Sequence, residues 1–170
     1  MNLPNKITLF RIFVFIPVFL IALLIEFPYH NIIAAILFIL GALSDVLDGY
    51  LARKQKQITN MGKLLDPVAD KLLITAGLIF LIGKGVEPWM AFIIIAREFL
   101  VTGYRLAAQS LGKTIPAGNW GKAKTASQVI AIVAVIIQFQ YSWHLMLIAV
   151  ILTAYSGITY LFSAKEVWKG

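Results

Sequence analysis

Four aspartates in two close pairs are the residues of this sequence best suited to chemistry. Asp45 and Asp48 are three positions apart, and Asp66 and Asp70 are four apart. Residues at these spacings share one face of an α-helix, so each pair would present its carboxylates to the same side. The chain has no cysteine and no histidine near these positions, so the donors are hard oxygens that favour Mg2+ or Mn2+ over zinc. The four positions therefore predict a divalent-metal site.

The charge of this site indicates which reaction it could support. Four carboxylates within one pocket repel one another unless cations balance them, and four negative charges match two divalent ions. Two such ions about 4 Å apart can hold a diphosphate and stabilise both the attacking and the leaving oxygen of a substitution at phosphorus. The aspartates thus favour transfer of a phosphate-linked group.

Three residues beside the first pair support this interpretation. Gly49 and Ala52 fall on the same helical face as that pair, and their small side chains would leave room for a nucleotide against the backbone. Close packing of two helices is the alternative use of such small residues. Arg53 could pair with the phosphates of the nucleotide, or it could be a cation at a helix end that extends toward the membrane surface.

The elements that would position these residues are apolar helices. Hydrophobic residues make up 60% of the 170-residue chain and charged residues only 14%. The mean hydropathy of +0.85 is too high for a soluble domain. Apolar segments close to the roughly 20 residues that a membrane-spanning helix needs fall at residues 7–26, 32–53, 65–83, 89–110, 123–139 and 145–164. We therefore expect a single all-α integral membrane domain, residues 1–170, with six transmembrane helices.

Basic residues indicate how these helices are oriented. Of the 15 Lys and Arg residues, only Lys84 falls outside the two termini and the regions around residues 53–71 and 97–124. The positive-inside rule then places both termini and these two regions at the cytoplasmic face of the cell membrane. The first apolar segment is longer than the core of a signal peptide and lacks a small-residue cleavage site, so we expect it to be retained as a helix.

The short connection after Arg53 predicts where the aspartates meet. It makes the helices on either side of it antiparallel neighbours, which brings both aspartate pairs to the cytoplasmic edge of the bilayer. Pro67 is then expected in the first turn of the second helix, where proline is tolerated. The net charge of +7 suits an anionic membrane surface and phosphorylated substrates. We find no nucleic-acid-binding module and expect no nucleic acid partner.

The aspartates and their neighbours resemble the signature of a known family, the CDP-alcohol phosphotransferases. The signature reads D-x-x-D-G-x-x-A-R, a short gap, and then G-x-x-x-D-x-x-x-D. Its fixed positions are filled here by Asp45, Asp48, Gly49, Ala52, Arg53, Gly62, Asp66 and Asp70. The resemblance implies a fold with the active site at the cytoplasmic border, two bound Mg2+ or Mn2+ ions, transfer to an acceptor hydroxyl, release of CMP, and a homodimer.

The same resemblance implies roles for individual residues. The four aspartates would be the metal ligands, and Asp70 would also be the general base that takes the proton of the acceptor. The residues expected to bind the donor, CDP-diacylglycerol, are Asn5, Thr8, Asp48, Gly49, Ala52, Arg53 and Gly62.

A cluster of basic residues in the second half of the chain suggests which acceptor is used. Its members are Arg97, Arg105, Lys113, Lys122 and Lys124. These are more cations than the metal site needs, and they could bind a separate phosphate, which favours a phosphorylated acceptor over serine or choline. The runs around them are also similar to the branch of the family that joins CDP-diacylglycerol to sn-glycerol 3-phosphate.

Several alternatives stay open. The lysines could be ordinary cytoplasmic charges, and Arg97 could simply pair with Glu98. Within the family, inositol phosphate transfer and cardiolipin synthesis are the alternatives. A small divalent-cation transporter would also carry intramembrane acids. Such a protein should gather them at the middle of the bilayer from two related halves, whereas here all four aspartates fall at one edge and no second half repeats them.

Overall fold

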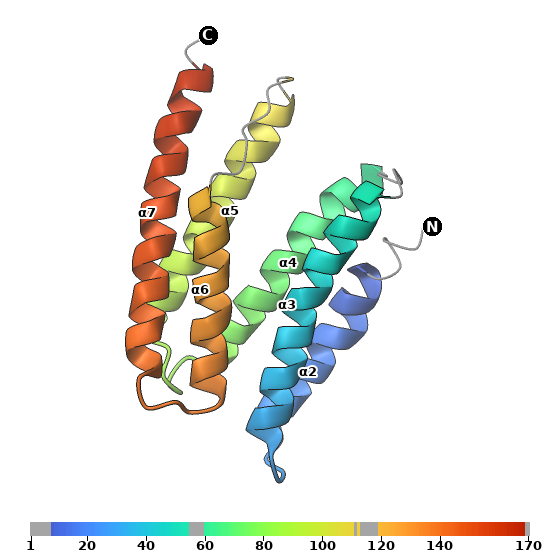
Figure 1. The fold of residues 1–170 in the computed structure, drawn as a ribbon, viewed down its shortest axis with the longest axis vertical. Coiled ribbons are helices and arrows are strands. Elements are labelled where there is room, and N and C mark those ends of the chain that lie inside the picture. Colours follow the sequence, from blue (N-terminus) through green and yellow to red (C-terminus); the bar gives the residue numbers. More distant parts are fainter. Residues whose placement is uncertain (1–7, 55–59, 111, 113–118, 169–170) are drawn as a thin grey trace.

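The computed structural model describes residues 8–54, 60–110, 112 and 119–168, and the side chains of residues 45–54, 60–67, 70, 119 and 163–168 lie outside the described part. Within these ranges the chain forms helices joined by turns (Figure 1). A short π-helix, η1 (Arg11–Phe15), runs directly into α2 (Ile16–Leu24). The other helices are α3 (His30–Lys54), α4 (Asn60–Phe80), α5 (Pro88–Ser110), α6 (Asn119–Ile136) and α7 (Ser142–Trp168).

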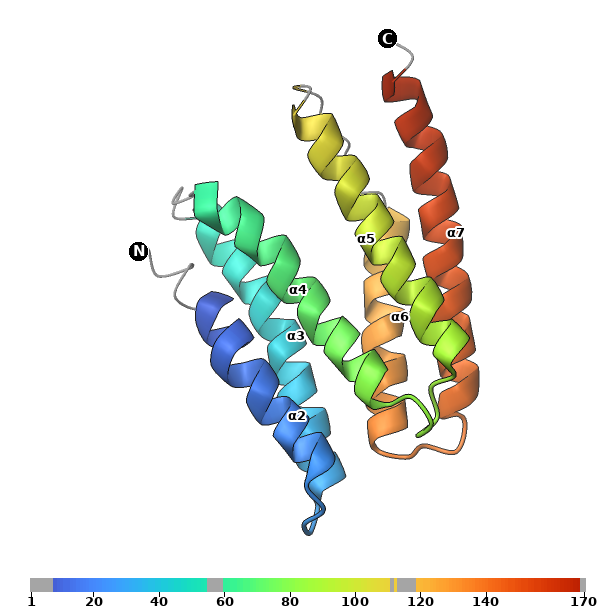
Figure 2. The same cartoon turned by 180° about the vertical axis from the view of Figure 1, so that it is seen from behind.

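The helices are arranged in two groups of three. One group contains α2, α3 and α4, and the other contains α5, α6 and α7, with α7 packed on both α5 and α6 (Figures 1 and 2). The two groups meet where α6 packs on α3 and α4. The end of α3, the start of α4, the end of α5 and the start of α6 all lie toward the upper end of the bundle in Figure 1.

A close-packed core joins the two groups. Phe38 of α3, Leu78 of α4 and Ile132 of α6 are fully buried. Gly77, which precedes Leu78 on α4, packs against the other two, and a Cβ atom there would be 3.2 Å from the Phe38 ring and 3.4 Å from Ile132. Small residues let helices approach this closely, which is how helices pack when the surrounding solvent is as apolar as their side chains.

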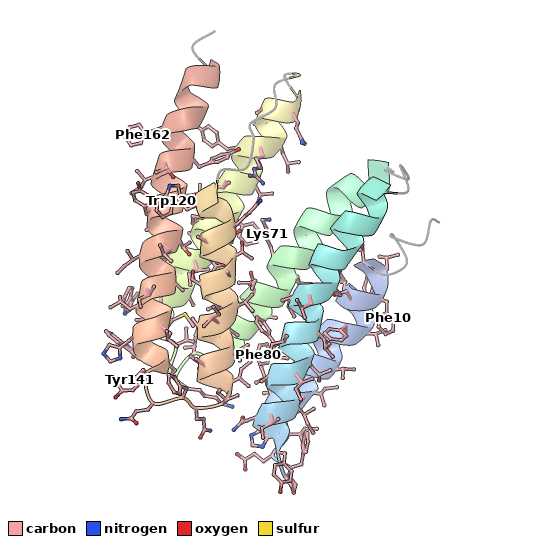
Figure 3. The ribbon with its side chains drawn as sticks, in the orientation of Figure 1. Phe10, Lys71, Phe80, Trp120, Tyr141 and Phe162 are labelled. Atoms are coloured by element: carbon pink, nitrogen blue, oxygen red, sulfur yellow. The ribbon has the colours of Figure 1, made fainter. Side chains whose placement is uncertain are left out.

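Large apolar side chains also cover the outside of the molecule. Phe13 and Phe92 are each 72% exposed and Phe162 is 68% exposed, and Figure 3 shows Phe10 and Phe162 directed away from the bundle. Exposed apolar surface on this scale marks a surface that contacts lipid or another protein. Among the described residues, one helical segment, Ser142–Phe162, is long and apolar enough by itself to cross a membrane.

The observed helices match the six apolar segments predicted from sequence, and the prediction of an all-α fold is confirmed. That all six segments cross the membrane stays a prediction. The expected place of Pro67 was wrong. Helix α4 begins at Asn60 rather than near residue 65, so Pro67 lies in its third turn. The apolar pattern starts later than the helix because the first turns of α4 are polar.

Candidate functional site

The two aspartate pairs lie on helix ends that are neighbours in space. Asp45 and Asp48 belong to the second half of α3, and Asp66 and Asp70 lie between the start and the middle of α4. The two helices are antiparallel and pack on each other, so both pairs lie at the same end of the bundle (Figures 1 and 2). The predicted backbone arrangement is therefore present.

The metal site itself stays a prediction. The carboxylates of all four aspartates lie outside the described part of the structure, and the described side chains include no group of three or more histidines or acids that could hold a metal. The donor set still fits a divalent ion, because it consists of four hard carboxylate ligands on two adjoining helix ends. Gly49, Ala52, Arg53 and Gly62 occupy the same helix ends.

A cavity of about 640 Å³ lies between the two groups of helices. It is lined by residues of η1, α3, α4, α5 and α6. Six of the described side chains that line it are basic and one, Glu98, is acidic; the basic residues are Arg11, Lys71, Arg97, Arg105, Lys122 and Lys124. Four of the five cations predicted to bind the acceptor are thus brought together, while Lys113 lies outside the described residues. Such an excess of positive charge attracts an anion.

This cavity, which we call the basic cavity, extends toward the aspartate ends of α3 and α4. Gly41 of α3 and Leu73 of α4 line it. In helical register, Asp45 comes one turn after Gly41, and Asp70 comes one turn before Leu73. Lys71, which also lines the cavity, follows Asp70 directly in sequence. The backbone therefore places the basic cavity next to the predicted metal site.

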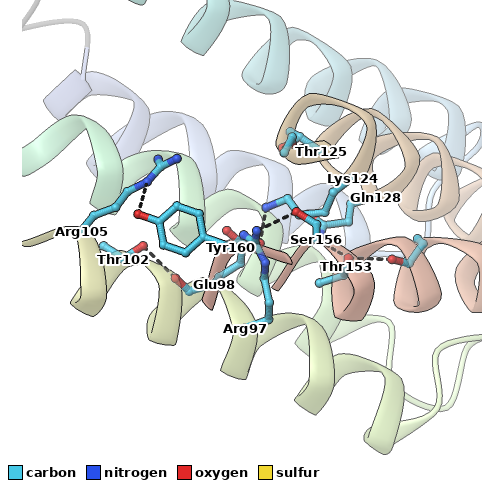
Figure 4. A network of polar contacts seen from close by, with 12 residues as sticks. Arg97, Glu98, Thr102, Arg105, Lys124, Thr125, Gln128, Thr153, Ser156 and Tyr160 are labelled. Atoms are coloured by element: carbon cyan, nitrogen blue, oxygen red, sulfur yellow. Dashed lines mark hydrogen bonds and ion pairs between the residues drawn. The ribbon is translucent and has the colours of Figure 1, made fainter. Parts of the chain in front are cut away.

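Glu98 is the acidic centre of the cavity wall. Its side chain is 9% exposed, and one carboxylate oxygen, Oε1, accepts hydrogen bonds from Lys124 Nζ and from Arg97 Nη1, the latter at 3.4 Å (Figure 4). An isolated buried carboxylate would be costly, and the two cations offset that cost. The pairing of Arg97 with Glu98 that sequence left open as an alternative is therefore observed, together with a second partner, Lys124.

The remaining predicted acceptor residues are more accessible. Lys122 and Arg105 are both exposed at the cavity. The Nη atoms of Arg105 make no hydrogen bond within the part of the chain that the structure describes, and neither does Lys122 Nζ. These nitrogens are available to an anion in the cavity.

The structure describes one of the two N-terminal residues that were predicted to bind the donor. Asn5 lies outside the described residues, and Thr8 is buried at 1% exposure. Arg11, the last residue of the same N-terminal run, lines the cavity, and its Nε donates to Ser44 Oγ at 3.0 Å. This contact joins η1 to α3 immediately before Asp45.

Sequence reasoning missed the contacts that α7 makes with two cavity arginines. Arg97 Nη2 donates to Ser156 Oγ at 2.8 Å, and Arg105 Nε donates to Tyr160 Oη at 3.3 Å (Figure 4). A signal was present, because Thr153, Ser156 and Tyr160 repeat along one face of an otherwise apolar helix. Polar residues in such a helix usually face a partner.

Known proteins are similar to this chain over most of its length. A model of the family described as CDP-alcohol phosphatidyltransferase matches residues 1–155. Curated relatives named CDP-diacylglycerol–glycerol-3-phosphate 3-phosphatidyltransferase are similar over nearly the whole chain. The protein of Bacillus subtilis (strain 168) is 41% identical, covering 99% of this chain and 97% of its own length. Those of Rickettsia bellii (strain RML369-C) and Pseudomonas fluorescens are 35% and 36% identical, with 97% and 96% of this chain and 96% and 90% of their own lengths covered.

Proposed function

Because this chain belongs to the CDP-alcohol phosphatidyltransferase family, we propose that it transfers the phosphatidyl group of CDP-diacylglycerol to sn-glycerol 3-phosphate. The products are phosphatidylglycerophosphate and CMP, and the reaction is a step in phospholipid biosynthesis. The relatives with this activity in their names support the choice of both substrates. The observation that carries the proposal is the basic cavity beside the aspartate ends of α3 and α4.

The four aspartates would hold two divalent ions, Mg2+ or Mn2+. When bound, such ions supply positive charge that neutralises a diphosphate. The ion requirement is supported by the donor set, which consists of carboxylates on adjoining helix ends. The nucleotide and diphosphate of the donor would contact Asp48, Gly49, Ala52, Arg53 and Gly62 on these helices, with Asn5 and Thr8 near the donor at the start of the chain.

The basic cavity would bind the phosphate of the acceptor. Arg105 and Lys122 have nitrogens available for it, and Arg97 contributes its charge from the cavity wall. Lys124 is paired with Glu98 and helps to set the charge of the wall, and Lys113 belongs to the same proposed group. Arginine is suited to this role because its planar guanidinium matches two phosphate oxygens.

The reaction then needs one proton transfer and one substitution. Asp70 takes the proton of the C1 hydroxyl of glycerol 3-phosphate. The alkoxide oxygen forms a bond to the phosphorus that carries the diacylglycerol, and the bond from this phosphorus to the CMP oxygen breaks. Holding donor and acceptor in adjoining sites makes the attack effectively unimolecular.

We further propose that the chain is a single domain whose six helical segments span the cell membrane. Both termini and the active site would face the cytoplasm, and two copies would form a homodimer. The exposed apolar side chains support membrane embedding, and the distribution of the Lys and Arg residues supports the orientation. The acyl chains of the donor would then stay in the bilayer during transfer.

The test is release of CMP from CDP-diacylglycerol by the purified protein in detergent with Mg2+ or Mn2+. Glycerol 3-phosphate, inositol phosphate, serine and phosphatidylglycerol are offered one at a time. We expect metal-dependent CMP and a new phosphorylated lipid with glycerol 3-phosphate alone. Turnover with a different acceptor alone would keep the family and overturn the acceptor. No CMP with any acceptor would overturn the enzyme proposal and call for a metal-flux assay.

A further inference from the structure

Helix α7 presents one buried polar face to the rest of its helix group. Thr153, Ser156 and Tyr160 are 0%, 3% and 8% exposed, and Gly157 is also buried. These positions are spaced so that they fall on one side of a helix. None of the described α7 side chains lines the basic cavity. The face nevertheless contacts two residues that do line it, Arg97 and Arg105.

Arg97 is held against α7 by the hydroxyl of Ser156 and by close packing on Gly157. Its Nη2 atom donates to Ser156 Oγ at 2.8 Å. Its aliphatic stem crosses Gly157, where a Cβ atom would lie 2.9 Å from Arg97 Cγ and 3.6 Å from Nε. The Nε atom is buried and has no hydrogen-bond partner among the described residues. The path of the side chain is therefore fixed by packing against Gly157 and by the contact with Ser156.

Arg105 lies two turns after Arg97 on α5, and its side chain is held by Tyr160 of α7. Its Nε donates to the Tyr160 hydroxyl at 3.3 Å, and its guanidinium carbon lies 5.3 Å from the centre of the Tyr160 ring (Figure 4). Arg105 lines the basic cavity, and the hydrogen bond uses only Nε, so both Nη atoms stay without a partner in the described structure. An arginine on an aromatic ring also gains a cation–π attraction.

We propose that Ser156, Gly157 and Tyr160 are positioning residues that orient Arg97 and Arg105 toward the phosphate of the acceptor. The assignment of that phosphate to glycerol 3-phosphate rests on the proposed function. Arginine side chains lose much rotational freedom when they bind a ligand, and fixing them beforehand removes that cost from binding. The α7 face therefore sets acceptor affinity without touching the acceptor.

Removal of each hydroxyl tests the proposal. In Ser156→Ala and Tyr160→Phe, we expect the KM for glycerol 3-phosphate to rise about three- to tenfold, the range for one hydrogen bond. The KM for CDP-diacylglycerol and kcat should stay within about twofold. Matched controls are Ser127→Ala, whose hydroxyl donates to the backbone of its own helix at Lys124 O, and Tyr155→Phe, whose ring contacts Trp120. Tyr160→Phe keeps the ring and its packing, so the fold should survive.

Gly157→Ala tests the packing contact independently. The added Cβ would displace the Arg97 stem near its base, so acceptor KM should rise about threefold or more. Alanine is the better helix former, so a general loss of helix stability is not expected. Gly103→Ala on α5 is the matched control, because nothing lies within 4 Å of a Cβ added there.

Binding of inorganic phosphate and of glycerol 3-phosphate, measured by calorimetry without donor, separates this proposal from the proposed function. Weaker binding in the three α7 variants supports positioning, even if the unaltered protein uses another acceptor. Unchanged binding, or an equal change in the KM for both substrates, overturns it. An unaltered protein that binds phosphate but does not turn over glycerol 3-phosphate overturns only the proposed function.

Discussion

At the scale of single residues, the proposed chemistry depends most on Asp70. We expect Asp70→Asn to bind CDP-diacylglycerol nearly as well as the unaltered protein but to lose turnover by about 100- to 10,000-fold, the usual contribution of a general base. Asparagine has the same shape but cannot accept the proton. Donor affinity by calorimetry and CMP release together measure the two effects. Turnover that persists while donor binding is lost would contradict the role.

Glu98 is the residue whose loss should most disturb the cavity wall. Glu98→Gln would leave Lys124 and Arg97 without their shared counter-charge. Removal of one partner from a buried ion pair typically costs about 3 kcal/mol or more, so we expect a lower Tm in detergent. The control is Glu87→Gln, since Glu87 is exposed in the turn before α5.

A double variant checks the cause. Lys124→Met added to Glu98→Gln removes one of the two cations that lose their shared counter-charge, and we expect it to recover part of the lost stability. If the double variant is less stable than the sum of the two single changes predicts, charge pairing is not the reason for the loss.

At the scale of elements, a buried hydrogen bond to Thr153, on the polar face of α7, joins α6 to α7. Gln128 Nε2 donates to Thr153 Oγ1 at 2.8 Å. Hydrogen bonds between helices in membranes average about 0.6 kcal/mol, so Thr153→Val should lower Tm slightly and leave the acceptor KM unchanged. Thr153 lies one turn from Ser156. A rise in the acceptor KM in Thr153→Val as well as in Ser156→Ala would therefore show that the packing of α7 alone controls acceptor affinity.

The sequence was sufficient for the helices and for which of them carry the aspartates, for physical reasons that differ by element, but not for how far into α4 Asp66 and Asp70 lie. Apolar segments of fixed length predict helices, and spacings of three and four predict a shared face for each aspartate pair. The start of α4 was missed because the polar residues at Asn60 and Lys63 carry no apolar pattern. The contacts of Ser156 and Tyr160 with Arg97 and Arg105 were missed because they join residues more than 50 positions apart, which local periodicity does not detect.

At the scale of the whole molecule, the two ends of the helix bundle differ in charge. The end with the aspartates carries the basic cavity, while the turn at the opposite end, between α4 and α5, carries Lys84. The proposed orientation puts the first end in the cytoplasm and Lys84 outside the cell. The chain has no natural cysteine, so a single introduced cysteine is the only target for a thiol reagent.

We therefore expect Lys84→Cys to react with a membrane-impermeant maleimide in intact cells, and Ser110→Cys to react only after the membrane is permeabilised. Both positions are exposed, so lack of labelling at Ser110 in intact cells reflects the barrier of the bilayer and not burial in the protein. The unaltered chain controls for background labelling. The reverse pattern would place the aspartate end of the bundle outside the cell, where a soluble phosphorylated acceptor made in the cytoplasm would not reach it, and would contradict the proposed topology.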